Sequence, residues 1–383
     1  MPTWSIRRWN GHGALWSQGR VENGVARPSG RGRALCRGFL PVLLLAMGAA
    51  SGCSWIFDRS PDFGPQAYYQ TAYPVHDMSE ELARAFEAVK RITVSASYDV
   101  YIFAEEGAPT MAEFSTGQAT VEPVDTLSIS RNRGATAVVV SATERNVALM
   151  TAHHAVHFPD TVAEYYQPAE GEVIVDPDDR RVRSLSVKTS QSNWIVGLPD
   201  VGTFEILAQD RVNDLALIGA QVPEDDDDDV EIEELERMGL DGEPTRLAWG
   251  SFVYVLGHPA SYPMVTRGIV SLPEGEGSDS FVVDGLWNQG MSGGPVLAIR
   301  GEDGRLEWVG MARAASAGGE HLFVPPEGAV EEQDPDEPYE GPIYLQEVQR
   351  IRYGIMLAVP MTEIRSFIDE HRTELLGRGF DLP

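Results

Sequence analysis

Cysteine is scarce in this chain, which has two, Cys36 and Cys53, in 383 residues. Both lie in an N-terminal part with the features of an export segment, so no pair remains to cross-link the folded part. A disulfide-stapled scaffold is therefore excluded. The hydrophobic fraction of 43% and the charged fraction of 23% are ordinary for globular proteins, and we expect a hydrophobic core to supply the stability.

Basic residues are also few. Lys and Arg number 30 against 58 Asp and Glu, which gives a formal net charge of −28. Binding to phosphates requires clustered basic side chains, so no nucleic-acid partner is expected. The exception is the segment before residue 38, which carries seven arginines and one acid. This basic end has the character of an export signal rather than of a binding surface.

A long apolar run is missing too, because the run over residues 38–50 is too short to span a bilayer as a helix. It fits the core of a signal peptide. The following Ala50-Ser51-Gly52-Cys53 resembles a bacterial lipobox, with Ala50 where Leu is usual. We predict that residues 1–52 are a lipoprotein-type signal peptide, that Cys53 is lipidated, and that the exported protein is attached to a membrane of the cell envelope or periplasm. A plain secretory signal and a short membrane anchor are the alternatives.

The rest of the chain divides by composition. Residues 53–78 contain three prolines and indicate a tether, and residues 378–383 form a short tail. Acidic segments at 224–229 and 327–340 interrupt the globular part between them. Like charges at this density repel, which predicts solvated loops, and the spaced ligands and glycine of an EF-hand are lacking. We expect neither a metal nor a cofactor.

Two helices are predicted near the ends of the globular part. Apolar residues at helical spacing indicate a helix over 79–92, capped by Asp77 or Ser79. A second helix is predicted over 363–376, where Gly377 ends it. Both should pack one apolar face on the core.

Between the helices, short patterns of alternating or continuous apolar residues indicate strands. The expected strands are 92–102, 126–130, 135–141, 147–150, 185–189, 215–218, 252–256, 268–272, 296–299 and 308–311. Many short strands without long helices between them predict an all-β fold, an antiparallel barrel or a sandwich.

The most specific chemical motif is Gly290-Met291-Ser292-Gly293-Gly294. Glycines beside a serine permit positive φ angles and a close approach of substrate. A serine hydroxyl is a weak nucleophile at its own pKa, so hydrolysis also requires a base within hydrogen-bond reach and donors for the oxyanion. A merely structural turn is the alternative for this motif taken alone.

Three histidines, His153, His154 and His157, follow the strand predicted over 147–150. A metal site is the alternative to a catalytic base, but no acidic or cysteine ligand lies at metal-site spacing. Residues 151–154 resemble the Thr-Ala-x-His segment of trypsin-like peptidases. That resemblance selects His154 as the base.

Asp214 begins the apolar strand predicted over 215–218, where a buried carboxylate can accept the imidazole Nδ1–H and fix the tautomer. Residues 214–217 are similar to the Asp-Leu-Ala-Leu segment of the bacterial members of that family. Asp210 is the nearest rival, but no apolar run follows it.

The resemblance extends over about residues 130–377. Residues 257–271 and 353–360 resemble segments of the HtrA (Deg) branch of the trypsin-like (chymotrypsin-fold) peptidases. The family implies an all-β peptidase domain over 79–377 with two six-stranded antiparallel barrels, at about 92–240 and 245–360. It also implies an oxyanion hole built from the N–H groups of Gly290 and Ser292. The chain ends soon after the last helix, so we expect no PDZ domain.

This resemblance predicts a serine endopeptidase that works through an acyl-enzyme. Ser292 would be the nucleophile, His154 the general base and acid, and Asp214 the group that orients His154. Its partners would be protein or peptide substrates. An α/β-hydrolase esterase also carries Gly-x-Ser-x-Gly, but its acid and histidine follow the serine, whereas here they precede it. The other alternative is a catalytically inactive trypsin-fold envelope lipoprotein that binds peptides or protein partners.

Substrate preference is the least determined property. In this family the S1 pocket is lined by residues before the serine and by a later strand, here 286–288 and 311–315. Neither segment has an acid that would bind Lys or Arg. We therefore expect a preference for small or apolar P1 side chains.

Overall fold

A computed structural model of the chain describes residues 67–74, 76–166, 177–198, 202–221, 235–274, 280–324 and 344–383. The chain splits into two compact units, Met1–Asp62 and Phe63–Pro383. The first unit lies outside the described residues, and with it the predicted signal peptide and Cys53. The predicted acidic loops at 224–229 and 327–340 also lie outside them. The fold and the site described below belong to the second unit.

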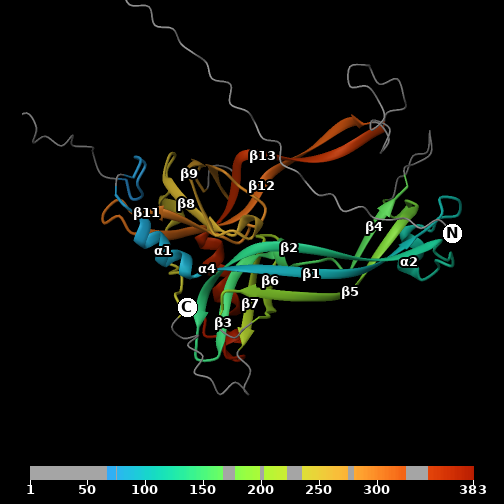
Figure 1. Ribbon diagram of the computed structural model, residues 1–383, viewed down its shortest axis with the longest axis horizontal. Coiled ribbons are helices and arrows are strands. Elements are labelled where there is room, and N and C mark those ends of the chain that lie inside the picture. The colour runs from blue at the N-terminus through green and yellow to red at the C-terminus, as the bar shows by residue number, and fades with distance from the viewer. Residues whose placement is uncertain are drawn as a thin grey trace, which may run out of the picture. The chain divides into compact units, whose positions relative to one another are not determined.

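The first half of this unit is an antiparallel sheet of seven strands, in the order β4-β5-β1-β2-β3-β7-β6 (Figure 1). Its strands are β1 (Val89–Ile102), β2 (Asp125–Ala142), β3 (Asn146–Ala152), β4 (Thr161–Tyr165), β5 (Val182–Val196), β6 (Glu205–Asp210) and β7 (Leu215–Gln221). Burial alternates along β1, as its sequence predicts, whereas residues 135–142 of β2 and residues 147–152 of β3 are buried on both faces. The sheet is therefore covered on both sides where β2 and β3 meet.

The second half is a closed barrel of six strands, in the order β10-β13-β12-β11-β8-β9. Its strands are β8 (Phe252–Gly257), β9 (Met264–Leu272), β10 (Phe281–Gly285), β11 (Pro295–Ile299), β12 (Leu306–Val324) and β13 (Tyr344–Pro360). The all-β prediction and its six-stranded second barrel are confirmed.

The first barrel differs in detail from the predicted closed six strands. Strands β1 and β2 pair continuously from Val89↔Val138 to Ile102↔Asp125, and β5 pairs with β1 over nearly the same length. Together they continue as a three-stranded extension beyond the main core (Figure 1). A small separate core that includes Phe103 packs at its end, which explains why β4 adds a seventh strand there.

The α-helices are short or lie near the ends of the domain. They are α1 (Ser79–Glu87), α2 (Met111–Thr116), α3 (His153–Val156) and α4 (Met361–Leu376). Helix α1 is shorter than predicted because β1 begins at Val89. Helix α4 buries Ile364, Phe367 and Ile368, as its apolar face predicts. None of the helices in the described part of the chain is long and apolar enough to cross a membrane.

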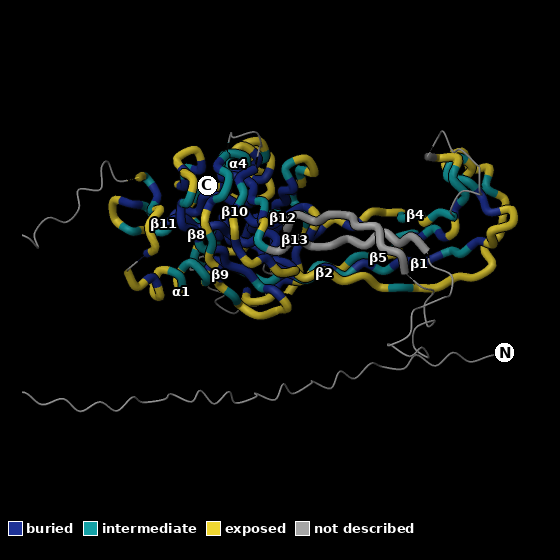
Figure 2. Tube along the Cα trace, turned by 90° about the horizontal axis from the view of Figure 1, so that it is seen from above, coloured by how far each residue is buried: buried dark blue, intermediate teal, exposed yellow. Residues whose placement is uncertain are grey.

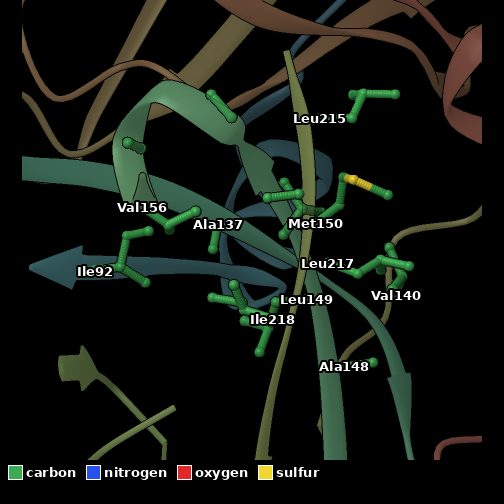
Figure 3. Close-up of a cluster of buried hydrophobic side chains, with 14 of the residues drawn as sticks. Ile92, Ala137, Val140, Ala148, Leu149, Met150, Val156, Leu215, Leu217 and Ile218 are labelled. Atoms are coloured by element: carbon green, nitrogen blue, oxygen red, sulfur yellow. The ribbon is translucent and has the colours of Figure 1, made fainter. Parts of the chain in front are cut away.

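One core joins the sheet to α4 and to the adjacent wall of the barrel. Leu149 of β3 lies opposite Ile218 of β7, and Met150 lies opposite Leu217. Because successive residues of a strand point to opposite faces, the two pairs lie on the two sides of the sheet. Figure 3 shows Leu149 beside Ile218, and all four side chains are completely buried. Burial of each such side chain contributes about 1.5–3 kcal/mol. A second core fills the barrel, and buried segments dominate the sheet-barrel body in Figure 2. The sheet and the barrel therefore hold each other in place through a shared core.

The segment before α1 packs on the barrel. The backbone N–H of Gln70 donates to the Ile299 carbonyl at 2.9 Å, and the Gln70 carbonyl accepts from the N–H of Phe252 at 2.8 Å. Tyr69 is 1% exposed. Residues 67–70 of the predicted 53–78 tether are thus part of the folded domain, because an aromatic side chain buried in the barrel anchors them.

Candidate active site

Ser292 lies in the loop that connects β10 to β11, and it is 4% exposed. Gly290 and Gly293 of this loop have φ angles of +103° and +85°. A Cβ at Gly293 would lie 2.1 Å from the Thr136 carbonyl oxygen, and one at Gly290 would lie 2.7 Å from the His258 carbonyl oxygen. Both positions therefore require glycine, which explains the motif found in the sequence.

His154 lies in α3, the single helical turn that directly follows β3. Its Nε2 lies 2.9 Å from Ser292 Oγ, and its Nδ1 lies 2.7 Å from Asp214 Oδ2. A carboxylate can only accept, so Nδ1 carries the proton and donates to Asp214. The Nε2 lone pair is then free to accept the Ser292 O–H. The structure thus brings the three predicted side chains into one hydrogen-bonded series.

Asp214 lies in the turn between β6 and β7 with φ at +59°, a left-handed conformation that Asp adopts more readily than most residues. Its carboxylate is buried, and Oδ1 accepts the backbone N–H of His154 at 2.9 Å. Its carbonyl accepts the N–H of His153 at 3.0 Å. The rival Asp210 instead accepts the N–H groups of Val212 and Asn213, and so caps its own turn.

The predicted oxyanion-hole donors are free. The backbone N–H groups of Gly290 and Ser292 donate to no other group in the described part of the chain. Both residues line a pocket of about 500 Å³ beside the serine. Donors that are already in place and unpaired can stabilise a negative oxygen without reorganisation.

Thr136 is a site residue that the sequence motifs did not reveal. This fully buried residue of β2 donates from Oγ1 to the Gly290 carbonyl at 2.7 Å and accepts the N–H of His258 at 2.9 Å. Its own N–H donates to the Ser292 carbonyl at 2.9 Å. One residue of the sheet therefore fixes the backbone on both sides of Met291. Its role depends on the contact with Gly290, which lies 154 positions away in the sequence. No local sequence pattern contains such a contact.

Arg313 on β12 is a second such residue. Its Nε lies 3.6 Å from Asp214 Oδ2, and its side chain is 34% exposed. Its carbonyl oxygen lies 3.3 Å from Ser292 Oγ, farther than His154 Nε2, and is the alternative acceptor for the single hydroxyl proton. A cation at this place compensates part of the charge of the buried carboxylate. The only sequence signal was its position inside the strand predicted to line the S1 pocket.

The neighbouring histidines form a packed pair. The rings of His153 and His157 stack with centroids 4.7 Å apart. Burial, with a smaller effect of His157, lowers the pKa of His153 below its ordinary value. Among the described residues, no three or more His, Cys, Asp or Glu side chains gather in a way that could hold a metal ion.

One protein-family model matches part of the chain. Residues 135–311 match the family model of the trypsin-like peptidase domain, a span that includes His154, Asp214 and Ser292. Among solved structures, the chain is similar to the HtrA-type protease AlgW in a variant solved with a decapeptide, at 16% identity and a TM-score of 0.39, covering 77% of this chain and 68% of that one. It is also similar to a serine endoprotease from Yersinia pestis, at 14% identity and a TM-score of 0.38, covering 78% and 67%. No curated protein sequence matches the chain.

Proposed function

Since the chain carries a trypsin-like peptidase domain, we propose that it is a serine endopeptidase that hydrolyses peptide bonds through an acyl-enzyme. The observation that carries the proposal is the series Asp214–His154–Ser292, whose two hydrogen bonds are 2.7 and 2.9 Å long. The unpaired N–H groups of Gly290 and Ser292 next to the serine hydroxyl support it further.

In the first half-reaction, Ser292 Oγ attacks the carbonyl carbon of the substrate while its proton passes to His154 Nε2. Asp214 stabilises the imidazolium that forms and keeps the ring in position. The carbonyl oxygen becomes an oxyanion and accepts from the N–H groups of Gly290 and Ser292, and each such donor is worth about 10²–10³ in rate. His154 then protonates the leaving amine, and an acyl group remains on Ser292.

In the second half-reaction, water takes the place of the leaving amine. His154 removes a proton from the water, whose oxygen attacks the acyl carbon, and the same N–H groups accept the second oxyanion. Collapse of this intermediate returns the proton to Ser292 Oγ and releases the new carboxylate. The enzyme regains its starting state, so no cofactor is consumed.

The test is turnover of an unstructured protein such as casein by the wild type and by Ser292→Ala. We expect the variant to lose at least about 10⁴-fold in kcat, because no other group can form the acyl-enzyme. Arg145→Gln, a change in the exposed turn between β2 and β3, serves as the control and should keep full activity. Equal turnover by wild type and Ser292→Ala would disprove the proposal. A folded wild type that cleaves nothing would favour the inactive, peptide-binding alternative.

We also propose that the protein belongs to the HtrA branch and is anchored by lipid at Cys53 in the cell envelope. The segments 257–271 and 353–360 support the branch, and the basic, apolar and lipobox-like residues before Cys53 support the anchor. Metabolic labelling with an alkyne fatty acid in a bacterial host should mark the wild type and not Cys53→Ser. Labelling of neither protein would contradict the anchor.

A further inference from the structure

The pocket beside Ser292 has the opposite charge to the protein as a whole. It has a volume of about 500 Å³, and the permanently charged residues that line it are Arg91 and Arg133. No Asp or Glu lines it within the described residues, although the chain has a net charge of −28. A cationic lining next to a nucleophile concentrates anionic groups there.

Arg91 of β1 has no hydrogen-bond or ion-pair partner among the residues that the structure describes. It is half-buried, its Nε is completely buried, and that atom has no hydrogen-bond acceptor among the described residues. It also forms no ion pair with a residue in the described ranges. A partly desolvated guanidinium without an acceptor is costly, and an incoming carboxylate would supply two acceptor oxygens.

Arg133 of β2 is held in place by neutral groups. Its guanidinium donates to the carbonyls of His154 and His157, the latter at 2.8 Å, and lies 4.3 Å from the ring centroid of Phe158. Burial lowers the pKa of Arg133, and its charge is not compensated by any carboxylate in the described part of the chain. A fixed side chain loses little entropy when it binds an anion.

His258 forms another part of this wall. Burial lowers the pKa of His258 to about 4, and the positive charges of Arg91 and Lys90 add to the effect. The ring is therefore neutral at neutral pH, and its buried Nδ1 has no partner among the described residues. The two arginines thus supply the positive charge of the pocket.

The position of the pocket indicates which part of a substrate it receives. His154 protonates the leaving amine, so the residues C-terminal to the scissile bond lie on the side of α3. Ala155 of α3 lines the pocket, and Arg133 is hydrogen-bonded to the same turn. Strand β12, which contacts Ser292 through the Arg313 carbonyl, contributes no residue to the lining.

We propose that this pocket is a carboxylate-binding subsite, in which Arg91 and Arg133 hold a carboxylate C-terminal to the scissile bond. The inference rests on the proposed peptidase function. The carboxylate comes either from an Asp or Glu side chain or from the C-terminus of the substrate, because both present the same two oxygens to a guanidinium.

The test uses fluorescent peptides that are identical up to the scissile bond. One carries Glu and a C-terminal amide on the leaving-group side, one Gln and a free C-terminus, and one Gln and an amide. Their affinities are measured by anisotropy with the Ser292→Ala protein, and their kcat/KM values with Ser292 intact. We expect at least one acidic peptide to bind about tenfold more tightly than the neutral one, as an Arg-carboxylate contact implies. The acidic peptide that binds more tightly than the neutral one identifies the source of the carboxylate.

The ratio of the affinities for the acidic and the neutral peptide should fall to nearly one in Arg91→Gln and in Arg133→Gln. It should persist in Arg145→Gln, which removes the same charge from an exposed turn. Arg91→Gln alone suffices if Arg133→Gln does not fold, since Arg133 supports α3. Equal affinity for all three peptides, or a preference that survives Arg91→Gln, would overturn the subsite. Selective binding without any cleavage would refute the peptidase and leave the subsite. Cleavage of all three peptides at the same rate would refute the subsite and leave the peptidase.

Discussion

At the scale of the residue, Thr136 shows how a single hydroxyl group connects the sheet to the loop between β10 and β11 that carries Ser292. Its Oγ1 donates to the Gly290 carbonyl and accepts from the His258 N–H, at 2.7 and 2.9 Å. The N–H of Gly290, a donor of the proposed oxyanion hole, belongs to the same residue as that carbonyl. A change at Thr136 should therefore act on the transition state more than on substrate binding.

We expect Thr136→Val to lower kcat by about 10- to 100-fold with little change in KM, since an unsupported Gly290 aims its N–H less accurately. Thr136→Ser keeps the hydroxyl and should restore most of the rate. The measurement is steady-state kinetics on one peptide. Thr136→Val with wild-type kcat, or Thr136→Ser as impaired as Thr136→Val, would contradict this role.

The three predicted catalytic residues were recognisable because each lies in a short local segment with its own pattern. The residues that support them were not. Thr136 and Arg313 act on groups 154 and 99 positions away, and Arg91 was indistinguishable in sequence from any other arginine on a strand. Local patterns indicated the residues of the proposed triad, whereas the side chains that surround them are brought there by tertiary packing.

At the scale of the element, the sequence predicted strands well where burial is regular and poorly elsewhere. Strands β3, β7, β8 and β11 were found within a few residues. Strand β2 was predicted as two pieces, because residues 131–134 break the apolar period. In the structure they continue the pairing with β1, where Arg133 lies opposite Val94. Backbone hydrogen bonds across a long extension do not require apolar side chains.

Residues 67–70 form an ordered segment on the barrel, and the Tyr69 hydroxyl group holds it in place. Tyr69 donates to Glu307 Oε2 at 2.8 Å and accepts the N–H of Glu243 at 2.8 Å. Burial raises the pKa of Tyr69 far above its ordinary value, so the hydroxyl remains a donor. Glu307 is 9% exposed and is also paired with Arg300.

We expect Tyr69→Phe to lower the free energy of unfolding by about 1–3 kcal/mol, because the buried Glu307 carboxylate and the Glu243 N–H each lose a partner. Tyr68→Phe is the matched control, since its hydroxyl makes no hydrogen bond with a described residue. Urea unfolding measures both changes. The account of this segment is wrong if the two substitutions have the same effect.

At the scale of the whole molecule, the site depends on the sheet and the barrel together. His154 and Asp214 belong to the sheet, while Ser292 precedes a barrel strand, and the shared core sets the distance between them. The hydrogen bond from the Thr136 N–H to the Ser292 carbonyl joins the sheet directly to the loop that carries Ser292. Loss of global stability should therefore also mean loss of the site.

Global stability should depend on pH through His258. Its pKa falls from the ordinary 6.5 to about 4 on folding. Between these pH values the unfolded chain binds a proton that the folded protein does not, so the free energy of unfolding falls as the pH is lowered from 6.5 toward 4. The group is partly exposed, and solvent screening limits the effect to roughly 1–2 kcal/mol.

His258→Asn, which is never charged, should lose this part of the pH dependence. Unfolding by urea at pH 7 and pH 4.5 gives the loss of stability for each protein, and subtracting the two values removes the contribution of His153, which has the same sign. A variant that loses as much stability as the wild type would show that His258 is protonated in the folded protein.

The central claim is that Ser292 is a nucleophile because His154 activates it. It is tested most directly by reaction with a fluorophosphonate, followed by mass spectrometry of the intact protein and its peptides. We predict one adduct on Ser292 in the wild type, none in Ser292→Ala, and labelling at least about 10³-fold slower in His154→Ala, since the base is missing. Labelling of another residue, or equally fast labelling of His154→Ala, would contradict the account.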